Sequence, residues 1–271
     1  MSNFAILVLG LGLLVRSHAA ELDSLKVPSG QPGDSVLVLV IVPGHGPVPP
    51  AGWPVAYLLH GFGANPYTML ELTDLGAAAD HYEIAIVCPD GRPESWYLDS
   101  PLDSTSHVET MIIERVLPQV EHRYPLRRDR YGRGILGLSM GGHGALYLAL
   151  RHPGLFGVAA SVSGVLDLTE TTQPAALARR LGTFEEYAAR WRANSVVALV
   201  DSLPGGQLAL SIDCGLQDPF IAANRRVHQK LLMRQIDHVY TERPGSHDRD
   251  TFARALRQQL LFLGEWFGAG K

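Results

Sequence analysis

The chain has 271 residues, 46% hydrophobic and 18% charged, which suits one sizeable α/β domain rather than two. A formal net charge of -4 without any basic cluster argues against nucleic acid as the main partner. The two cysteines, Cys88 and Cys214, each end a predicted strand, which favours buried small side chains over a disulfide or a metal pair. No C-x-x-C or H-E-x-x-H pattern occurs, so no metal site is predicted.

The N-terminus begins with an apolar run, 4–15, that is too short to span a membrane comfortably. Cleavage after Ala19 would place small residues, Ala19 and Ser17, at the last and third-last positions before the cleaved bond. Residues 1–20 therefore resemble a secretory signal peptide. We therefore expect one domain over 21–271, a secreted or periplasmic location and no stable membrane partner. The first three residues carry no Lys or Arg, and an apolar first strand or an uncleaved anchor is the alternative; without a signal peptide the protein would be cytoplasmic.

Strands and helices are predicted to alternate along the first half of the chain. Continuous apolar, β-branched runs predict strands at 36–42, 55–59 and 84–88. Apolar positions at helical spacing predict helices over 67–80 and 108–123, the second of them bent by Pro118. An irregular loop that is rich in aromatic residues, 95–100, lies before this second helix.

The second half continues the alternation after a strand, turn and helix within 133–146. Further strands are predicted at 158–163, 208–214 and 238–241, and helices at 220–235 and 248–267. Between 166 and 203 the pattern is helical but irregular. We interpret this segment as a small excursion over the active site rather than a separate domain.

Apolar strands that alternate with helices are typical of a parallel sheet covered on both faces. The predicted fold class is therefore α/β, with a mostly parallel central sheet and helices on both sides. Ligand chemistry in such sheets lies at the carboxyl ends of the strands. Ser139, Asp218, His247 and the loop 60–63 all follow predicted strands, so we expect them to meet at one edge of the sheet.

The turn Gly137-Leu138-Ser139-Met140-Gly141 matches the G-x-S-x-G pattern of a nucleophile elbow. Glycines flank such a serine because a Cβ there would collide with neighbouring backbone. The turn lifts the serine hydroxyl above the sheet, where a base and a substrate can both reach it. The alternative is a glycine-rich turn whose serine only caps the helix.

A serine needs a base, and a histidine needs a carboxylate to hold its tautomer. His247 is the predicted base because it lies in a loop between the last strand and the final helix, whereas His143, His152 and His228 lie on predicted helices. Three carboxylates compete for the acid, and Asp218, in a turn just past a strand, is preferred over Asp167 and Asp213. The order Ser, Asp, His is the order of the α/β-hydrolases.

Acyl transfer also needs two donors for the developing oxyanion. One is expected from the backbone N–H of Met140, the residue after the nucleophile, and the other from Phe62 in the loop after an early strand. The alternative for that loop is an ordinary turn at the end of a strand. Trp96, Tyr97 and Trp191 are candidates for lining the substrate pocket, with ordinary core packing as the alternative for each.

The motifs together resemble the esterase D family of α/β-hydrolases over about 36–267. The segments that carry the resemblance are Tyr57 to Gly63, Cys88 to Gly91, Ser95 to Ser100, Gly137 to Ala145 and Gly245 to Asp248. The resemblance implies Ser139 as nucleophile, Asp218 and His247 as acid and base, and Phe62 and Met140 as oxyanion donors. Members often carry an aromatic residue after the His-Asp pair, where this chain has Arg249 and Asp250, and His107 also departs from the pattern.

The sequence thus predicts a serine hydrolase that needs no cofactor and acts on a small-molecule carboxylic ester through an acyl-enzyme. Short or small acyl groups are favoured because no long apolar insertion suggests a lipid lid. One alternative is an acyltransferase that passes the acyl group to a sugar or a thiol. Another is a non-catalytic binding protein with a hydrolase fold. The sequence leaves the oligomeric state open.

Overall fold

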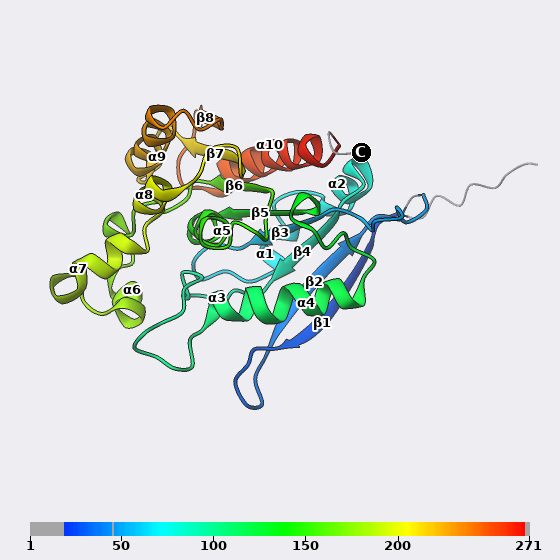
Figure 1. Cartoon of the computed structure of the whole chain (residues 1–271), viewed down its shortest axis with the longest axis horizontal. Helices are drawn as coiled ribbons and strands as arrows, with labels where there is room; N and C mark the ends of the chain where they lie inside the picture. Colours follow the sequence, from blue (N-terminus) through cyan, green and yellow to red (C-terminus); the bar gives the residue numbers. More distant parts are fainter. Residues whose placement is uncertain (1–18, 45, 269–271) are drawn as a thin grey trace, which may run out of the picture.

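The computed structural model describes residues 19–44 and 46–268. Within them the strands form one sheet, in the order β1-β2-β4-β3-β5-β6-β7-β8 (Figure 1). Their bounds are β1 Glu21–Pro28, β2 Ser35–Val42, β3 Val55–Leu59, β4 Ala85–Pro89, β5 Arg133–Leu138, β6 Val158–Val162, β7 Ala209–Gly215 and β8 Val239–Arg243. The pairs β1–β2 and β2–β4 are antiparallel and the other neighbours are parallel, so the predicted mostly parallel α/β sheet is confirmed.

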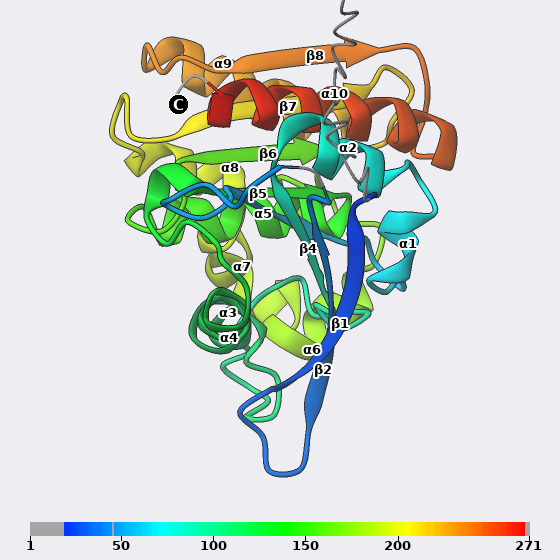
Figure 2. The same ribbon diagram turned by 90° about the vertical axis from the view of Figure 1, so that its right-hand side faces the viewer.

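Helices cover both faces of this sheet (Figure 2). Their bounds are α1 Tyr67–Leu70, α2 Leu75–Tyr82, α3 Val108–Met111, α4 Leu117–Arg123, α5 Met140–Arg151, α6 Pro174–Leu181, α7 Phe184–Ala193, α8 Val196–Leu199, α9 Ile221–Met233 and α10 Arg249–Gly268. Side chains alternate between the faces of a strand. In β3, Tyr57 accordingly packs with the α4, α5 and α9 side, whereas Ala56 and Leu58 pack with the α2 and α10 side.

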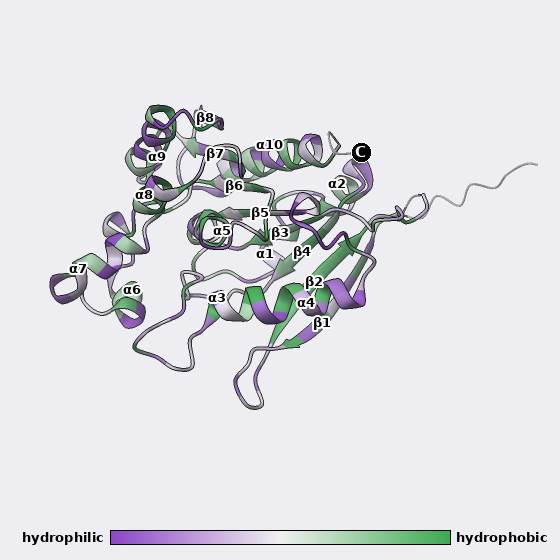
Figure 3. Cartoon of the chain, viewed as in Figure 1, coloured by the Kyte–Doolittle hydropathy of each residue, from purple (hydrophilic) through white to green (hydrophobic). Residues whose placement is uncertain are grey.

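The core follows directly from the apolar runs in the sequence. Every residue of β3, β4, β5 and β6 is buried, and Figure 3 shows β2 and β4 largely in the hydrophobic colour. Cys88 and Cys214 are buried and unpaired, as expected of small core side chains. Burial raises the pKa of the Cys88 thiol to about 12, which leaves it protonated and unreactive near neutral pH.

Two predicted helices differ from the observed ones. The expected helix over 67–80 is two helices: α1 ends at Leu70, and the Asp74 side chain accepts a hydrogen bond from the N–H of Ala77 (2.9 Å), which caps the start of α2. The helix over 108–123 does run from α3 to α4, but a π-helical turn, Ile112–Val116, precedes Pro118. A widened turn accommodates a proline ring that would otherwise clash with the preceding turn.

Strand β1 was not expected from the sequence. It pairs with β2 over its whole length, but most of its side chains are exposed or half-buried, so it lacks the apolar run that marks the other strands. The expected excursion after β6 is present as α6, α7 and α8, and α6 and α7 project to one side of the sheet (Figure 1). Residues 1–18 of the expected signal peptide lie outside the described residues, and that assignment stays a prediction. No helix within the described ranges has the length and apolar character needed to cross a bilayer.

Candidate active site

Ser139 occupies a sharp turn between β5 and α5. Its backbone has φ 55° and ψ -116°, a strained conformation for a residue with a side chain. A Cβ on Gly137 would lie 1.9 Å from the carbonyl oxygen of Gly141, and one on Gly141 would lie 2.2 Å from that of Leu59. Both flanking glycines are therefore required sterically, as predicted for an elbow.

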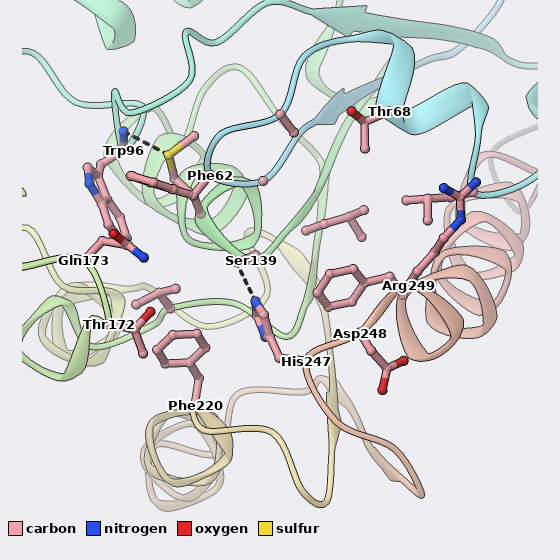
Figure 4. A pocket seen from close by; sticks show the side chains of 17 residues that line it. Phe62, Thr68, Trp96, Ser139, Thr172, Gln173, Phe220, His247, Asp248 and Arg249 are labelled. Atoms are coloured by element: carbon pink, nitrogen blue, oxygen red, sulfur yellow. Dashed lines mark hydrogen bonds between the residues drawn. The ribbon is translucent and has the colours of Figure 1, made fainter. Parts of the chain in front are cut away.

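The elbow brings Ser139 to two side chains from distant loops. The Ser139 Oγ lies 2.8 Å from His247 Nε2 (Figure 4), and His247 Nδ1 lies 2.8 Å from Asp218 Oδ2. Asp218 is only 2% exposed, and its other oxygen accepts a hydrogen bond from the N–H of Phe220 (2.9 Å). The hydroxyl can donate to Nε2 while Nδ1–H donates to the carboxylate, which is the tautomer that a general base needs.

The two other candidate acids lie elsewhere. Asp213 is buried in β7, where both its oxygens accept from the Arg243 guanidinium, with Nε at 2.7 Å. Asp167 follows β6 but turns back to the N–H of Thr169 and to Arg226, at 3.0 Å each. The structure therefore brings Asp218 to His247 and gives each alternative carboxylate an arginine partner.

The helix-borne histidines also lie away from Ser139 Oγ. His152 contacts Glu109 through Nε2 at 2.8 Å, and the His228 ring lies against His238. His143 is fully buried on α5, stacked on Tyr147, with Nε2 donating to the carbonyl of Asn194 (2.9 Å). These positions agree with the interpretation of the three as surface or core residues.

Burial of His143 predicts a loss of stability in acid. Desolvation lowers its pKa from 6.5 to about 4, because the charged imidazolium would lose its hydration. The unfolded chain takes up a proton as pH falls through 6.5, whereas the folded protein does not until about 4, so stability is full above 6.5 and falls below it. A shift of this size corresponds to about 3 kcal/mol. Urea unfolding at several pH values should show a flatter profile for His143→Gln than for the wild type; parallel profiles would contradict this.

Phe62 and Met140, the expected oxyanion donors, lie on two separate elements beside Ser139. Met140 is the first residue of α5, and such N–H groups have no acceptor within the helix. Phe62 lies in the loop after β3, and both residues line the same pocket as Ser139. The loop is fixed by His60, which is fully buried; its Nδ1 donates to the carbonyl of Gly61 (2.9 Å) and its Nε2 accepts from the N–H of Gly91 (3.0 Å). Sequence reasoning did not assign this role to His60.

A cavity of about 440 Å³ opens above the Ser139 hydroxyl (Figure 4). Its lining is mostly apolar, and a few polar side chains lie in it at some distance from Ser139. The lining residues are Gly61, Phe62, Ala64, Thr68, Leu72, Trp96, Leu138, Ser139, Met140, Val165, Thr172, Gln173, Phe220, His247, Asp248, Arg249 and Phe252. An apolar cleft with few polar groups suits a small organic substrate.

Of the three aromatic residues expected at the pocket, Trp96 alone is in its lining. Its ring lies 6.0 Å from that of Phe62, and its backbone N–H donates to the Met140 sulfur at 3.4 Å. Tyr97 lies in the core, where its hydroxyl donates to the carbonyl of His60 (3.0 Å). Trp191 is buried within α7 and donates to the carbonyl of Gly182 (2.9 Å). Tyr97 and Trp191 therefore follow the alternative of ordinary core packing.

Two phenylalanines flank His247 and were not singled out from the sequence. The rings of Phe220 and Phe252 meet the imidazole nearly edge-on, with centroids at 5.1 and 4.9 Å and interplanar angles of 80° and 89°. Phe220 follows Asp218 by two residues, and Phe252 lies in the first turn of α10. Their position close to Asp218 and His247 in the chain was the signal by which the sequence could have identified them.

Asp248 anchors the loop that carries His247. It accepts from the Ser246 hydroxyl (2.5 Å) and from the N–H of Thr251 (2.8 Å) at the start of α10. These hydrogen bonds, the hydroxyl first, hold the pKa of this exposed carboxyl well below its usual range. The side chain is thus a charged helix cap beside the pocket.

A strand, a strained serine turn and a helix, with the histidine and the carboxylate on later loops of a mostly parallel sheet, define an α/β-hydrolase. The solved structure of a ferulic acid esterase has this fold, with a TM-score of 0.77 and 23% identity over 92% of this chain and 100% of that one. The chain belongs to the family described as "Putative esterase", whose model matches residues 29–263.

Curated relatives agree with this family. An esterase of Mycobacterium tuberculosis is 29% identical over 234 residues, or 72% of this chain and 48% of that protein. An acetyl esterase of Caldicellulosiruptor saccharolyticus is 27% identical over 221 residues, or 77% of this chain and 82% of that protein. The chain thus spans about half the length of the mycobacterial relative.

Proposed function

We propose that the protein is a serine carboxylic-ester hydrolase that acts on short-chain or small acyl esters through an acyl-enzyme. The observation that carries the proposal is the unbroken chain from the Ser139 hydroxyl through His247 to the buried Asp218, at the floor of an apolar cavity. Membership of an esterase family supports the same chemistry.

In the proposed first step, Ser139 Oγ attacks the acyl carbon while its proton passes to His247 Nε2. Asp218 stabilises the imidazolium through Nδ1–H, and its hydrogen bond from Phe220 keeps the carboxylate oriented. The carbonyl oxygen becomes an oxyanion, which the N–H groups of Phe62 and Met140 would stabilise. The imidazolium then returns the proton to the departing alkoxide, and the acyl–oxygen bond to Ser139 remains.

Water completes the cycle from the same positions. His247 takes a proton from the water, whose oxygen attacks the acyl carbon, and the proton then returns to Ser139 Oγ as the acid leaves. Two phenyl edges beside the imidazole limit the orientations that it can adopt. The cavity of about 440 Å³ and the name of the acetyl esterase relative both favour small acyl groups.

The test is hydrolysis of p-nitrophenyl esters from acetate to palmitate, together with labelling by a fluorophosphonate probe. We expect turnover on the short esters, a burst of p-nitrophenol and labelling of Ser139. Products are analysed with and without an added sugar or thiol. Acyl transfer to the acceptor in place of free acid would assign a transferase, and absence of both labelling and turnover would assign a binding protein.

A further inference from the structure

The pocket has two ends of different construction (Figure 4). Trp96, Thr172 and Gln173 lie at one end, whereas Thr68 and Arg249 lie at the other. The second end is formed by α1 and by the start of α10, which are 178 residues apart at the contact between Glu71 and Arg249.

Arg249 bridges this end of the pocket to the turn between α1 and α2. Its Nη2 donates to the backbone carbonyl of Glu71 (2.7 Å), and its Nη1 lies 3.3 Å from Glu71 Oε2. The side chains of Arg249 and Glu71 are 65% and 59% exposed, although Arg249 belongs to the pocket lining. The guanidinium thus sits in solvent against Glu71 while the apolar stem bounds the cavity, as long basic side chains commonly do.

A second hollow, of about 580 Å³, lies on the other side of the same turn. Its lining includes Leu22, Ile41, Leu70 and Leu75. Leu72 lines both hollows, and Glu71, the bridge partner, lines the second. The segment 71–72 therefore separates the pocket from an outer hollow with several apolar side chains, and Arg249 holds that segment in place.

We propose that the Arg249–Glu71 bridge closes this end of the pocket and restricts the ester substituent that lies there to a short chain. The proposal rests on the proposed function and names a determinant of its substrate range. Releasing the bridge lets the 71–72 segment move and gives a longer aliphatic chain access to the outer hollow. Burial of each further methylene then favours longer substrates.

The local charges favour a closing role over recognition of an anion. Among the described residues that line the pocket, Arg249 is the one Arg or Lys, and its guanidinium faces the Glu71 carboxylate. One carboxylate against one guanidinium leaves no net positive charge at this end of the pocket for an anionic substrate. Exposed ion pairs contribute little to folding, so removing this one is expected to change selectivity without unfolding the protein.

The experiment compares Arg249→Ala, Arg249→Met and the wild type on two substrate series. One series varies the acyl chain of p-nitrophenyl esters from acetate to dodecanoate, and the other varies the alcohol of alkyl acetates. Arg249→Ala should raise the ratio of kcat/KM for the longest to the shortest ester by about tenfold or more in one series. Arg249→Met, which keeps a stem but no bridge, should give a smaller increase. Arg257→Ala, an exposed arginine on the same helix, is the control and should leave the ratio unchanged.

Two outcomes would overturn the proposal. One is an unchanged length profile in both series. The other is a loss confined to an anionic ester, tested with the p-nitrophenyl hemiester of succinate beside neutral butyrate, which would make Arg249 an anion-binding residue. Calorimetric binding of the same p-nitrophenyl and alkyl esters to proteins that also carry Ser139→Ala tests length selection without turnover. A length shift in binding would support the bridge even if hydrolysis failed, and equal binding profiles would refute it even if hydrolysis succeeded.

Discussion

Ser139→Ala is expected to lower kcat for p-nitrophenyl acetate by about 10⁶-fold, and His247→Ala by a similar factor. The hydroxyl and the imidazole are 2.8 Å apart and act as one unit in the proposed attack, so neither retains its effect without the other. The double variant should therefore be no slower than either single variant. Steady-state hydrolysis, with protein mass spectrometry after phosphonate treatment, measures the loss of both turnover and labelling.

Matched controls separate this result from a general loss of structure. Ser202→Ala and His122→Ala remove the same groups from exposed positions and should keep wild-type activity. Circular dichroism should show all variants folded. Additive losses in the double variant would mean that Ser139 and His247 act independently, which would contradict the proposed mechanism.

The second large effect concerns the carboxylate. Asp218→Asn is expected to lower kcat by about 10⁴-fold with little change in fold. The asparagine fits the same buried space, but its amide NH₂ would face His247 Nδ1 and favour the tautomer with the proton on Nε2. That tautomer cannot accept the proton of Ser139.

Asp167→Asn provides the comparison, because Asp167 was a candidate acid in the sequence and lies instead against Arg226 and the N–H of Thr169. The kcat of the Asp167→Asn variant should stay within a few-fold of the wild-type value. A large loss of kcat in Asp167→Asn together with a small loss in Asp218→Asn would show that the catalytic acid is Asp167 and would contradict the proposal. Measurement of kcat at several pH values for both variants gives this comparison directly.

Much of the fold was predictable because burial marks the central strands so strongly. The runs at 55–59 and 36–42 correspond to β3 and β2, and each is short and almost wholly apolar. Strand β1 escaped prediction because an edge strand shields little of the core. The break between α1 and α2 escaped it because the apolar spacing continues through Asp74, although α1 ends at Leu70 and the Asp74 side chain caps the start of α2.

The catalytic candidates divide in the same way. The elbow is local, since the steric need for Gly137 and Gly141 arises within a few residues of Ser139 and from the adjacent strand. Which aromatic residues reach the pocket is not local. Trp96 and Tyr97 are neighbours in the chain with φ angles of 59° and 57°, yet the first lines the pocket and the second supports His60 from the core.

By itself, the sequence determined the buried strands and most of the helices in their order, the serine turn, and the loops in which a base and an acid follow strands. These properties depend on hydrophobic periodicity and on backbone geometry, which act over a few residues. The sequence preferred Asp218 among three carboxylates, but only the tertiary structure brings it to His247, turns Asp213 and Asp167 to arginines, and brings Arg249 to Glu71. Such pairings depend on where the sheet places segments that are far apart in the chain. A local sequence pattern does not predict which of these segments meet in space.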